Sequence, residues 1–194
     1  MSDLMAAEKA LIRARIRNAR SEMSEQSRLH AREGFTTQLV ALVESLGASR
    51  LSCFVPTATE PDVSGFLEWA KAAELDMLFP ASRDDGYLDW ISPSGSGHRS
   101  GKFGIREPLG ELLPPGAVEH VDLMLVPAAA ADLSGNRLGW GRGYFDRTLE
   151  ALTHRPPVYA VIFDTEVFDA VPVEPHDAPV QGIVTPKRTL TFSA

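Results

Sequence analysis

The chain has 194 residues, which is enough for one sizeable α/β domain or two small ones. Its net charge of −7 argues against a nucleic-acid-binding protein that relies on a generally basic surface. The single cysteine, Cys53, allows no intrachain disulfide, and we expect it to be a buried strand residue in a reducing cytosol. Because no apolar stretch approaches the roughly 20 residues of a membrane helix, we expect a cytoplasmic protein with no membrane or nucleic-acid partner.

The N-terminal region predicts two helices, at residues 4–22 and 24–46. Four cations share one face of the first helix at spacings of four, four and three: Lys9, Arg13, Arg17 and Arg20. Like charges on one face repel each other, and a bound anion would relieve that repulsion; a solvated basic face is the alternative. Ser24 and Gly47 are expected to cap the second helix.

The middle of the chain alternates strand and helix patterns. Strands are predicted at 50–55, 75–79 and 87–91, with a helix that Asp62 caps at 62–74 and with Pro80 closing the second strand. Glu60 lies in the loop after the first strand, at the sheet edge where ligands bind in open α/β folds. Residues 92–102 are rich in Gly and Ser, which predicts a mobile loop that is either a lid or plain slack.

A strand, a glycine loop and a helix follow one another between residues 121 and 152. The apolar run 121–126 predicts a buried strand that Pro127 ends, and 144–152 has a helical pattern. The loop between them has glycines on alternate positions, flanked by three arginines: Gly139, Gly141 and Gly143, with Arg137, Arg142 and Arg147. This arrangement presents free backbone N–H groups and a positive helix end to an anion, although a glycine turn that only lets a helix pack on a sheet is the alternative.

The C-terminal region adds a strand at 158–163 and a proline-broken tail that ends in a short strand at 182–185. Strands that alternate with helices predict an α/β fold with a mostly parallel sheet and helices on both faces. No internal repeat or long linker is present, so we expect a single domain over residues 1–194. We also expect a monomer, because no heptad seam or additional apolar helix face is present.

Five separated elements together resemble the 5-formyltetrahydrofolate cyclo-ligase (methenyltetrahydrofolate synthetase) family. They are Lys9 with Arg13, Glu60, FGIREP at 103–108, GNRLGWGRGYFDRTL at 135–149 and HDAPVQGIVTP at 176–186. The resemblance implies a Rossmann-like fold related to the NagB/RpiA/CoA-transferase type. It also implies conversion of 5-formyltetrahydrofolate, with or without a polyglutamate tail, to 5,10-methenyltetrahydrofolate, with ATP and Mg²⁺ as cofactors and ADP and phosphate as products.

The same resemblance assigns roles to individual residues. The catalytic candidates are Arg13, Arg142 and Tyr144. The ATP-binding candidates are Lys9, Arg13, Arg137, Gly139, Gly141, Arg142, Gly143, Tyr144 and Phe145. The folate-binding candidates are Val55, Glu60, Phe103, Trp140 and Tyr144. The candidate Mg²⁺ ligands are Asp146 and, as a second choice, Asp177.

Each candidate has a structural alternative. Asp146 could simply favour a helix N-terminus, and Asp177 could be a turn residue. Trp140 and Phe103 could be core aromatics, and Glu60 could be a solvated loop charge. Two other functions compete with the cyclo-ligase: a non-catalytic folate- or nucleotide-binding protein, and a kinase-like or ligase enzyme of the same fold that acts on another small amide.

Four features depart from the pattern of the family. The loop before the glycines reads PAAAAD (127–132) where bulkier residues are usual, and Phe145 replaces a common Tyr. Gln181 stands where an acidic residue is frequent, and Val63 replaces a frequent Thr. None of them removes a phosphate-binding or metal-binding group, so we expect them to affect substrate fit and rate rather than the type of reaction.

Overall fold

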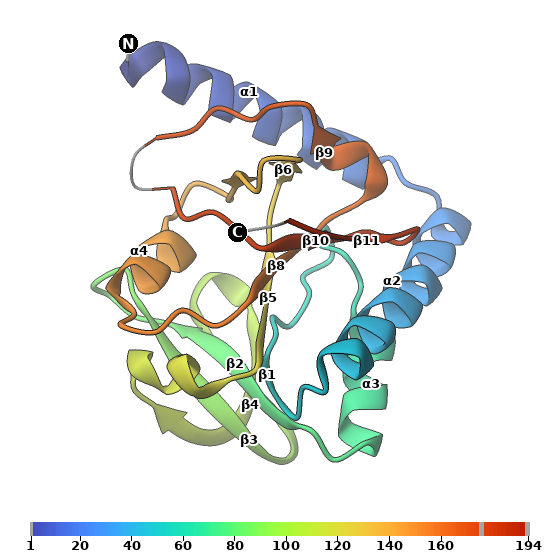
Figure 1. The fold of residues 1–194 in the computed structure, drawn as a ribbon, viewed down its shortest axis with the longest axis vertical. Helices are drawn as coiled ribbons and strands as arrows, with labels where there is room; N and C mark the ends of the chain where they lie inside the picture. The colour runs from blue at the N-terminus through green and yellow to red at the C-terminus, as the bar shows by residue number, and fades with distance from the viewer. Residues whose placement is uncertain (1, 175–176, 193–194) are drawn as a thin grey trace.

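An eight-stranded sheet forms the centre of the computed structural model, which describes residues 2–174 and 177–192 (Figure 1). Its strands are β1 (Arg50–Ser52), β2 (Asp76–Ser82), β3 (Leu88–Ser100), β4 (Arg106–Leu113), β5 (Leu123–Pro127), β8 (Val158–Val161), β10 (Gly182–Val184) and β11 (Thr189–Thr191). They are ordered β11-β10-β8-β5-β1-β2-β3-β4. Strands β10, β8, β5, β1 and β2 run parallel, whereas β3, β4 and β11 pair antiparallel. The sheet is therefore mixed. The prediction of a mostly parallel sheet holds for its five central strands, and the antiparallel pairing of the strands at its two edges was not predicted.

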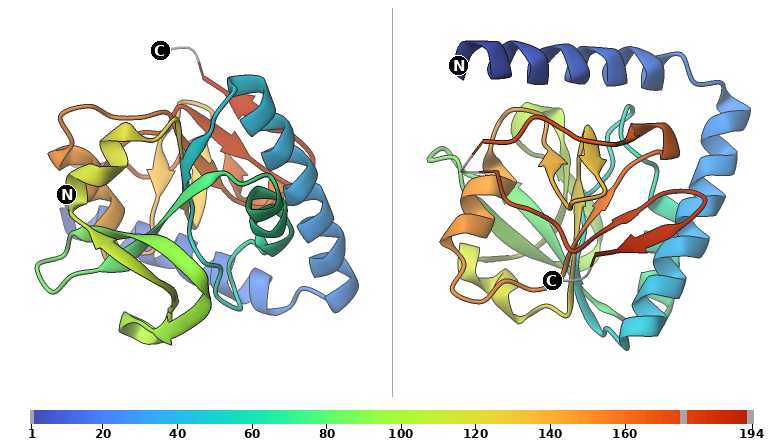
Figure 2. Two further views of the ribbon diagram at one scale, coloured as in Figure 1. Left: turned by 90° about the horizontal axis from the view of Figure 1, so that it is seen from below. Right: turned by 45° about the horizontal axis from the view of Figure 1, so that its top comes forward.

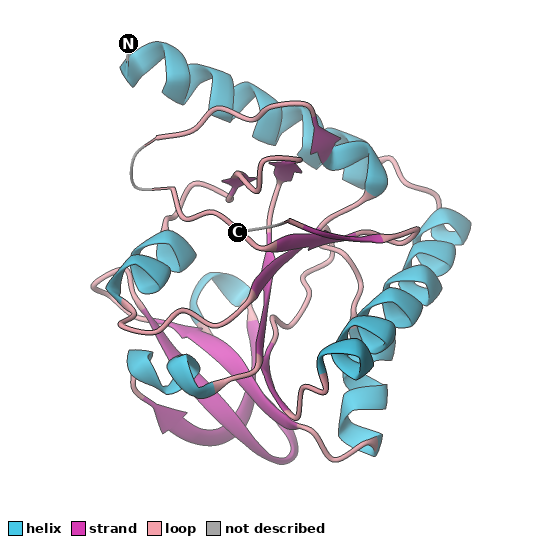
Figure 3. Cartoon of the chain, in the orientation of Figure 1, coloured by secondary structure: helices cyan, strands magenta, loops and turns pink. Residues whose placement is uncertain are grey.

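Helices cover both faces of this sheet, as predicted (Figure 3). They are α1 (Ser2–Ser21), α2 (Glu25–Leu46), α3 (Ser64–Ala72) and α4 (Tyr144–Ala151), with 3₁₀ turns η1 (Lys102–Gly104), η2 (Pro115–His120) and η3 (Asp164–Glu166). Strand β5 shows the division: Leu123 and Leu125 pack against α2 and α3, while Met124 and Val126 face α4 and η2. This alternation follows from the period of two in a strand and buries β5 on both sides.

Helix α1 lies across the edge of the sheet where the parallel strands end (Figure 2). Below it is a three-stranded sheet of order β7-β6-β9, made of β7 (Arg137–Leu138), β6 (Ala130–Asp132) and β9 (Val167–Phe168). Ile12 of α1 packs on the apolar cluster of this small sheet. In the described part of the chain, no helix combines the length and the apolar character needed to cross a membrane.

The predictions for the first two helices and for the burial of Cys53 are confirmed, whereas β1 ends at Ser52 rather than at 55, so Cys53 lies just after the strand. The Ser24 hydroxyl accepts a hydrogen bond from the backbone N–H of Ser27, and Gly47 ends α2 in the left-handed conformation. Cys53 is 1% exposed, and burial raises the pKa of its thiol. A buried thiol of raised pKa is a packing residue rather than a nucleophile.

The predicted bounds of α3 and β2 were wrong. Helix α3 begins at Ser64 rather than at 62, because Asp62 accepts a hydrogen bond from the Ser64 backbone N–H in a turn ahead of the helix. Strand β2 continues through Pro80 to Ser82. It pairs with β1 only over Asp76–Leu78, so the missing N–H of Pro80 leaves no gap in a ladder on that side.

The prediction of a mobile loop at 92–102 was also wrong. Most of this segment belongs to the long strand β3, which pairs with β4 and shifts register between Pro93 and His98. Two glycines of this segment leave room for side chains of β4: a Cβ at Gly97 would lie 2.6 Å from a methyl carbon of Leu109, and one at Gly101 would lie 2.3 Å from a carboxylate oxygen of Glu107. The Gly and Ser residues of this segment therefore belong to an irregular β-hairpin and not to a loop without regular structure.

Gly34 in the middle of α2 gives a first testable prediction. A Cβ at this position would lie 2.4 Å from the carbonyl oxygen of Pro186, so helix and C-terminal segment touch at main-chain distance. Alanine normally stabilises a helix by about 1 kcal/mol relative to glycine. We expect Gly34→Ala instead to lower the free energy of unfolding by about 1–3 kcal/mol, because the backbone must shift. Urea unfolding measures this; Gly116→Ala in η2, where a Cβ meets open space, is the control and should not destabilise.

Candidate functional site

The glycine loop between β7 and α4 takes a shape that side chains disfavour. Gly141 and Gly143 have φ values of +90° and +68°, in the left-handed region. A Cβ at Gly141 would lie 3.3 Å from the guanidinium carbon of Arg13, and one at Gly143 would lie 2.7 Å from a guanidinium nitrogen of Arg147. The loop therefore lets two arginines pack directly on its backbone.

Two cavities meet at this loop. The apolar cavity, about 210 Å³, lies toward the β3–β4 hairpin; the charged cavity, about 450 Å³, lies toward α1. Predicted residues that line only the apolar cavity are Val55, Glu60, Phe103, Arg137, Trp140, Tyr144 and Phe145. Those that line only the charged cavity are Lys9, Arg13, Gly141 and Asp177. Residues shared by both are Gly139, Arg142, Gly143 and Asp146. The structure thus brings every sequence-predicted site residue into one of two adjoining cavities.

Three of the four cations predicted on one face of α1 point into the molecule: Lys9 and Arg20 are buried and Arg13 is half-buried, whereas Arg17 is exposed. Lys9 is 4% exposed and binds Glu174 at 2.8 Å and Asp177 at 2.5 Å. Burial alone would lower the pKa of Lys9, but hydrogen bonds to both carboxylates raise it above its ordinary value. Arg13 donates from Nε to the carbonyl oxygen of Gly139 at 2.7 Å. The alternative of a solvated basic face is wrong for Lys9, Arg13 and Arg20.

Burial lowers the pKa of Arg13, although the charges of Asp177, Asp146 and Glu174 oppose that effect. A guanidinium remains protonated despite such a shift. Its Nε is used to hold the glycine loop, and its terminal nitrogens are the part of the fork that matches two phosphate oxygens. The position of Arg13 is therefore fixed before any anion binds.

Asp146 stands in the first turn of α4 and pairs with Arg137, which is buried. Its Oδ1 accepts from Arg137 and from the backbone N–H of Ala178, while Oδ2 lies 3.7 Å from where a Cβ at Gly139 would be. Among the described residues, the buried Nε of Arg137 has no hydrogen-bond partner, and no cluster of three or more metal-ligating side chains exists. Asp146 is thus a single carboxylate at the boundary of both cavities.

The apolar cavity is walled by aromatic side chains. Phe103 and Tyr144 meet edge to face, with ring centroids 6.2 Å apart, and the guanidinium carbon of Arg142 lies 3.4 Å from the centre of the Phe103 ring. Phe103 is half exposed and has a φ of +61°, which is unusual for a bulky side chain. Because half of its surface is exposed, Phe103 is not a core aromatic, and the strained backbone is a feature found at ligand sites.

Glu60 and Trp140 complete this wall. The Glu60 carboxylate accepts a hydrogen bond from the backbone N–H of Thr57 at 2.9 Å, and Glu60 is half-buried rather than solvated. The Trp140 ring lies beneath the guanidinium groups of Arg17 and Arg20, whose carbons are 5.7 and 5.0 Å from the ring centroid. Two cations of α1 therefore position an aromatic side chain of the glycine loop.

Sequence reasoning missed three residues that shape the site. Arg20 is 2% exposed and forms a two-pronged ion pair with Glu166, with both N–O distances at 2.7 Å. It also donates to the carbonyl oxygens of Thr59 and Ala128. Glu107, inside the FGIREP segment, is buried in the apolar cavity and pairs with Arg99. The spacing of the α1 cations indicated Arg20, whereas nothing local indicated Glu166 or the burial of Glu107.

The departures from the family pattern have structural explanations. Ala128 to Ala131 are completely buried, so larger side chains would not fit without displacing their neighbours. The Gln181 side chain accepts a hydrogen bond from the Val158 N–H at 2.8 Å, which an amide oxygen supplies as well as a carboxylate does. Val63 is buried in the core, and Phe145 packs against the cluster that includes Leu149.

Comparisons with known proteins agree on one family. A family model described as the 5-formyltetrahydrofolate cyclo-ligase family matches residues 5–186. A 5-formyltetrahydrofolate cyclo-ligase of Mycolicibacterium smegmatis is 36% identical over 164 residues, which cover 81% of this chain and 84% of the relative. The enzyme of that name from Escherichia coli K12 is 26% identical over 159 residues, covering 73% and 86%.

Solved structures give the same result for the fold. The 5,10-methenyltetrahydrofolate synthetase of Aquifex aeolicus superposes with a TM-score of 0.81 at 28% identity, covering 96% of this chain and 93% of that one. A 5,10-methenyltetrahydrofolate synthetase from Mycoplasma pneumoniae superposes with a TM-score of 0.74 at 21% identity, covering 92% and 99%.

Proposed function

Because the chain belongs to the 5-formyltetrahydrofolate cyclo-ligase family, it is a ligase whose reaction is driven by ATP, and we propose that its two cavities hold the two substrates. The charged cavity receives the triphosphate of ATP, and the apolar cavity receives 5-formyltetrahydrofolate. The observation that carries this proposal is the shared wall: Gly139, Arg142, Gly143 and Asp146 line both cavities. A phosphoryl group can pass between the substrates only where the two sites adjoin.

The charged cavity offers the groups that a triphosphate needs. Arg13, Arg142 and Lys9 supply positive charge, and the backbone of the glycine loop leads into the N-terminus of α4. Lys9 is already paired with Glu174 and Asp177, so it contributes charge by exchanging partners or by fixing the C-terminal segment beside α1. Arg13 and Arg142 are therefore the principal phosphate ligands in this proposal.

The apolar cavity offers aromatic walls and a carboxylate to a folate. Phe103, Tyr144 and Trp140 can contact the flat rings, and Glu60 can accept hydrogen bonds from pterin N–H groups. The formyl oxygen would then lie at the shared wall, beside Arg142. Tyr144 donates its hydroxyl to the carbonyl oxygen of Arg83 at 3.1 Å, so its proposed role is to orient the folate through its ring.

The chemistry solves the problem of a poor leaving group. The formyl oxygen attacks the γ-phosphorus, the bond to the β–γ bridging oxygen breaks, and ADP leaves. N10 then forms a bond to the formyl carbon and loses its proton, while the bond from that carbon to the phosphorylated oxygen breaks and phosphate leaves. Arg13 and Arg142 stabilise the negative charge on the transferring group, which is the main task of a phosphoryl-transfer site.

Asp146 is the proposed protein ligand for Mg²⁺, with Asp177 as the second candidate. Mg²⁺ is usually held by one or two carboxylates together with substrate phosphates rather than by a protein cage. Asp146 is the carboxylate at the shared wall, and it binds Arg137 and Ala178 through Oδ1, so Oδ2 is the atom proposed to bind the ion. Asp177 is engaged with Lys9 and lines only the charged cavity. When bound, the ion neutralises phosphate charge during transfer.

The decisive assay follows absorbance of the methenyl product with purified protein, 5-formyltetrahydrofolate and Mg²⁺–ATP, and phosphate release in parallel. We expect an ATP-dependent rise with one phosphate released for each product formed. Folate binding by calorimetry without turnover would instead indicate a non-catalytic binding protein. ADP formation with a different small amide, and none with this folate, would indicate another ligase of the same fold.

Asp146→Asn tests the metal assignment. The amide keeps the size of the side chain but loses the negative charge, so we expect the Mg²⁺ concentration for half-maximal activity to rise by about tenfold. Asp177→Asn is the paired variant and should change this concentration less. If the Mg²⁺ dependence of Asp146→Asn equals that of the wild type, Asp146 serves only to hold Arg137.

A further inference from the structure

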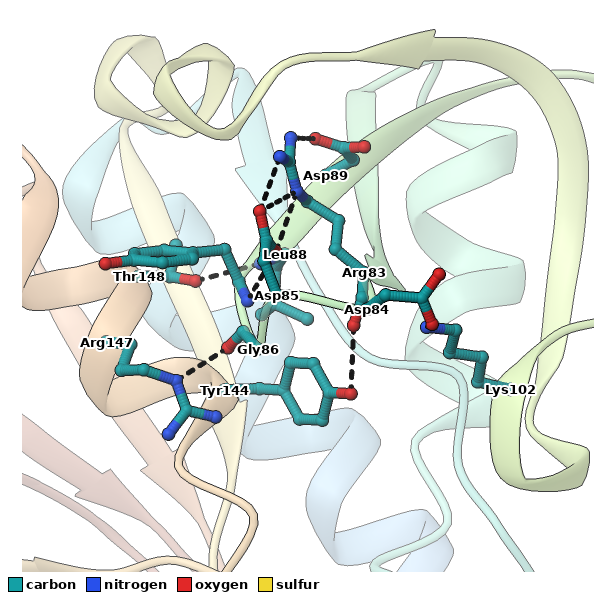
Figure 4. Close-up of polar contacts among 11 residues, drawn as sticks. Arg83, Asp84, Asp85, Gly86, Leu88, Asp89, Lys102, Tyr144, Arg147 and Thr148 are labelled. Carbon is teal, nitrogen blue, oxygen red and sulfur yellow. Dashed lines mark hydrogen bonds and ion pairs between the residues drawn. The ribbon is translucent and has the colours of Figure 1, made fainter.

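One face of α4 binds main-chain atoms of the turn that joins β2 to β3 (residues 83–87) and of Leu88, the first residue of β3 (Figure 4). Tyr144 donates its hydroxyl to the Arg83 carbonyl oxygen at 3.1 Å. Arg147 donates from Nε to the Gly86 carbonyl oxygen at 2.9 Å, and the Thr148 hydroxyl accepts from the Leu88 N–H at 3.1 Å. These side chains stand at i, i+3 and i+4, so they lie on one side of the helix. The turn and the first turns of α4 are therefore held in a fixed relation.

Of these three side chains, it is Arg147 whose hydrogen bonds extend this connection to the glycine loop. Its second donor, a terminal guanidinium nitrogen, binds the Arg142 carbonyl oxygen at 2.6 Å. The guanidinium thus joins the β2–β3 turn to the residue whose own side chain lines both cavities. An arginine fork can make two such bonds at once, whereas a lysine ammonium on a single stem cannot match this geometry.

Two glycines with positive φ accommodate this guanidinium. A Cβ at Gly86, where φ is +87°, would lie 2.7 Å from Nε of Arg147, and a Cβ at Gly143, where φ is +68°, would also lie 2.7 Å from one of its nitrogens. The backbone on both sides therefore leaves the space that Arg147 fills. A surface arginine with no structural task would not need two such positions.

We propose that Arg147 is a positioning residue for phosphoryl transfer, which fixes residue 142 against the β2–β3 turn so that the Arg142 side chain faces the triphosphate. This inference rests on the proposed function and adds a residue that acts through Arg142. Arg147 also lines the charged cavity, so direct contact with phosphate is the competing role. The two roles predict different couplings with Arg142.

The experiment is a double-mutant cycle on the full chain, measured as Mg²⁺–ADP affinity by calorimetry and as KM and kcat for ATP. Arg147→Met should weaken Mg²⁺–ADP binding by about tenfold in the wild-type background, as expected when a binding loop loses its position. In the Arg142→Met background the same change should cost less than twofold, because the side chain that it positions is already absent. Equal losses in both backgrounds would show direct phosphate contact and overturn the proposal.

Two more variants control for charge and folding. Arg147→Lys keeps the charge but not the fork, and we expect it to recover little of the lost affinity; full recovery would overturn the positioning role. Arg155→Met removes an equivalent exposed charge that donates to the Leu149 carbonyl oxygen at the far end of α4, and it should leave binding unchanged. Urea unfolding of each variant checks that the comparison is between folded proteins.

The outcome for the wild type separates this proposal from the function on which it rests. If wild-type protein bound no Mg²⁺–ADP, the proposed function would fail, and the positioning role would fail with it. If wild-type protein binds Mg²⁺–ADP and turns over, while Arg147→Met behaves like the wild type, only the role of Arg147 is wrong.

Discussion

Arg13→Ala is expected to cost about 2–4 kcal/mol of transition-state stabilisation, seen mainly as a lower kcat. Arg13 is half-buried, its Nε is fixed on the Gly139 carbonyl oxygen, and its guanidinium lies against Gly141. A donor held in place in this way pays no reorganisation cost when charge develops on the transferring phosphoryl group. ATP affinity should fall less than kcat, because Arg142, Lys9 and the loop backbone remain.

The measurement is steady-state kinetics with ATP varied at saturating 5-formyltetrahydrofolate. Arg15→Ala removes the same charge from an exposed position on α1 and should leave both constants within about twofold, because exposed charges contribute little. Arg13→Lys should recover only part of kcat, since an ammonium lacks the fork. An unchanged kcat in Arg13→Ala would contradict the role of Arg13 in phosphoryl transfer.

The second large effect concerns stability. Arg20→Met should lower the free energy of unfolding by about 3–5 kcal/mol, because it leaves the carboxylate of Glu166 buried without its cation. Arg20 also donates to the carbonyl oxygens of Thr59 and Ala128, so the change releases the Glu60 loop and the end of β5 from α1. Urea unfolding followed by circular dichroism measures the loss.

Replacing the Glu166 carboxylate with a neutral amide should reverse most of the stability loss of Arg20→Met. In Arg20→Met/Glu166→Gln the buried charge is gone, and the amide oxygen can still accept from the Phe163 N–H as the carboxylate does at 2.8 Å. We expect the double variant to regain at least half of the loss. A loss in the double variant equal to the sum of the two single losses would show no coupling between the side chains, and would contradict the stranded charge as the cause.

The pH dependence of Arg20→Met has a definite sign. Burial raises the pKa of Glu166, while Arg20 opposes that effect, so removing Arg20 raises this pKa further. A carboxyl whose folded pKa exceeds its unfolded value destabilises the fold as pH rises through the interval between them. The deficit of Arg20→Met should therefore be smallest below the unfolded pKa and grow as pH rises toward neutrality. A deficit that does not change with pH would contradict this explanation.

Local patterns predicted the helices, the caps of α2 and the glycine loop, because each depends on neighbours within a few residues; the predicted Asp62 cap of α3 was wrong. Ser24 and Gly47 illustrate this, since each caps α2 through its own conformation or hydroxyl. The strand β3 could not be predicted in the same way, because Gly and Ser at 92–101 resemble a loop until β4 pairs with them. Strands of two or three residues, such as β7 and β9, are too short to carry a period.

The candidate site shows the same limit. The resemblance brought together residues that the structure places in two adjoining cavities. It did not indicate that Lys9 binds Glu174, which is 165 residues away in the chain, or that Arg20 binds Glu166. Such pairs depend on how α1 crosses the sheet edge, and one sequence contains no local signal for that crossing.

The way α4 holds the β2–β3 turn has an evolutionary consequence. Two side chains of α4 bind carbonyl oxygens there and a third binds an N–H. Because these are main-chain groups, the contacts depend on the shape of the turn and not on which side chains residues 83, 86 and 88 carry. The hairpin that follows supplies Phe103, Ile105 and Glu107 to the apolar cavity, and among the described residues it supplies none to the charged one. Apart from Phe103, on which Arg142 stacks, mutations along the hairpin can therefore change the lining of the apolar cavity while the lining of the charged cavity is inherited unchanged.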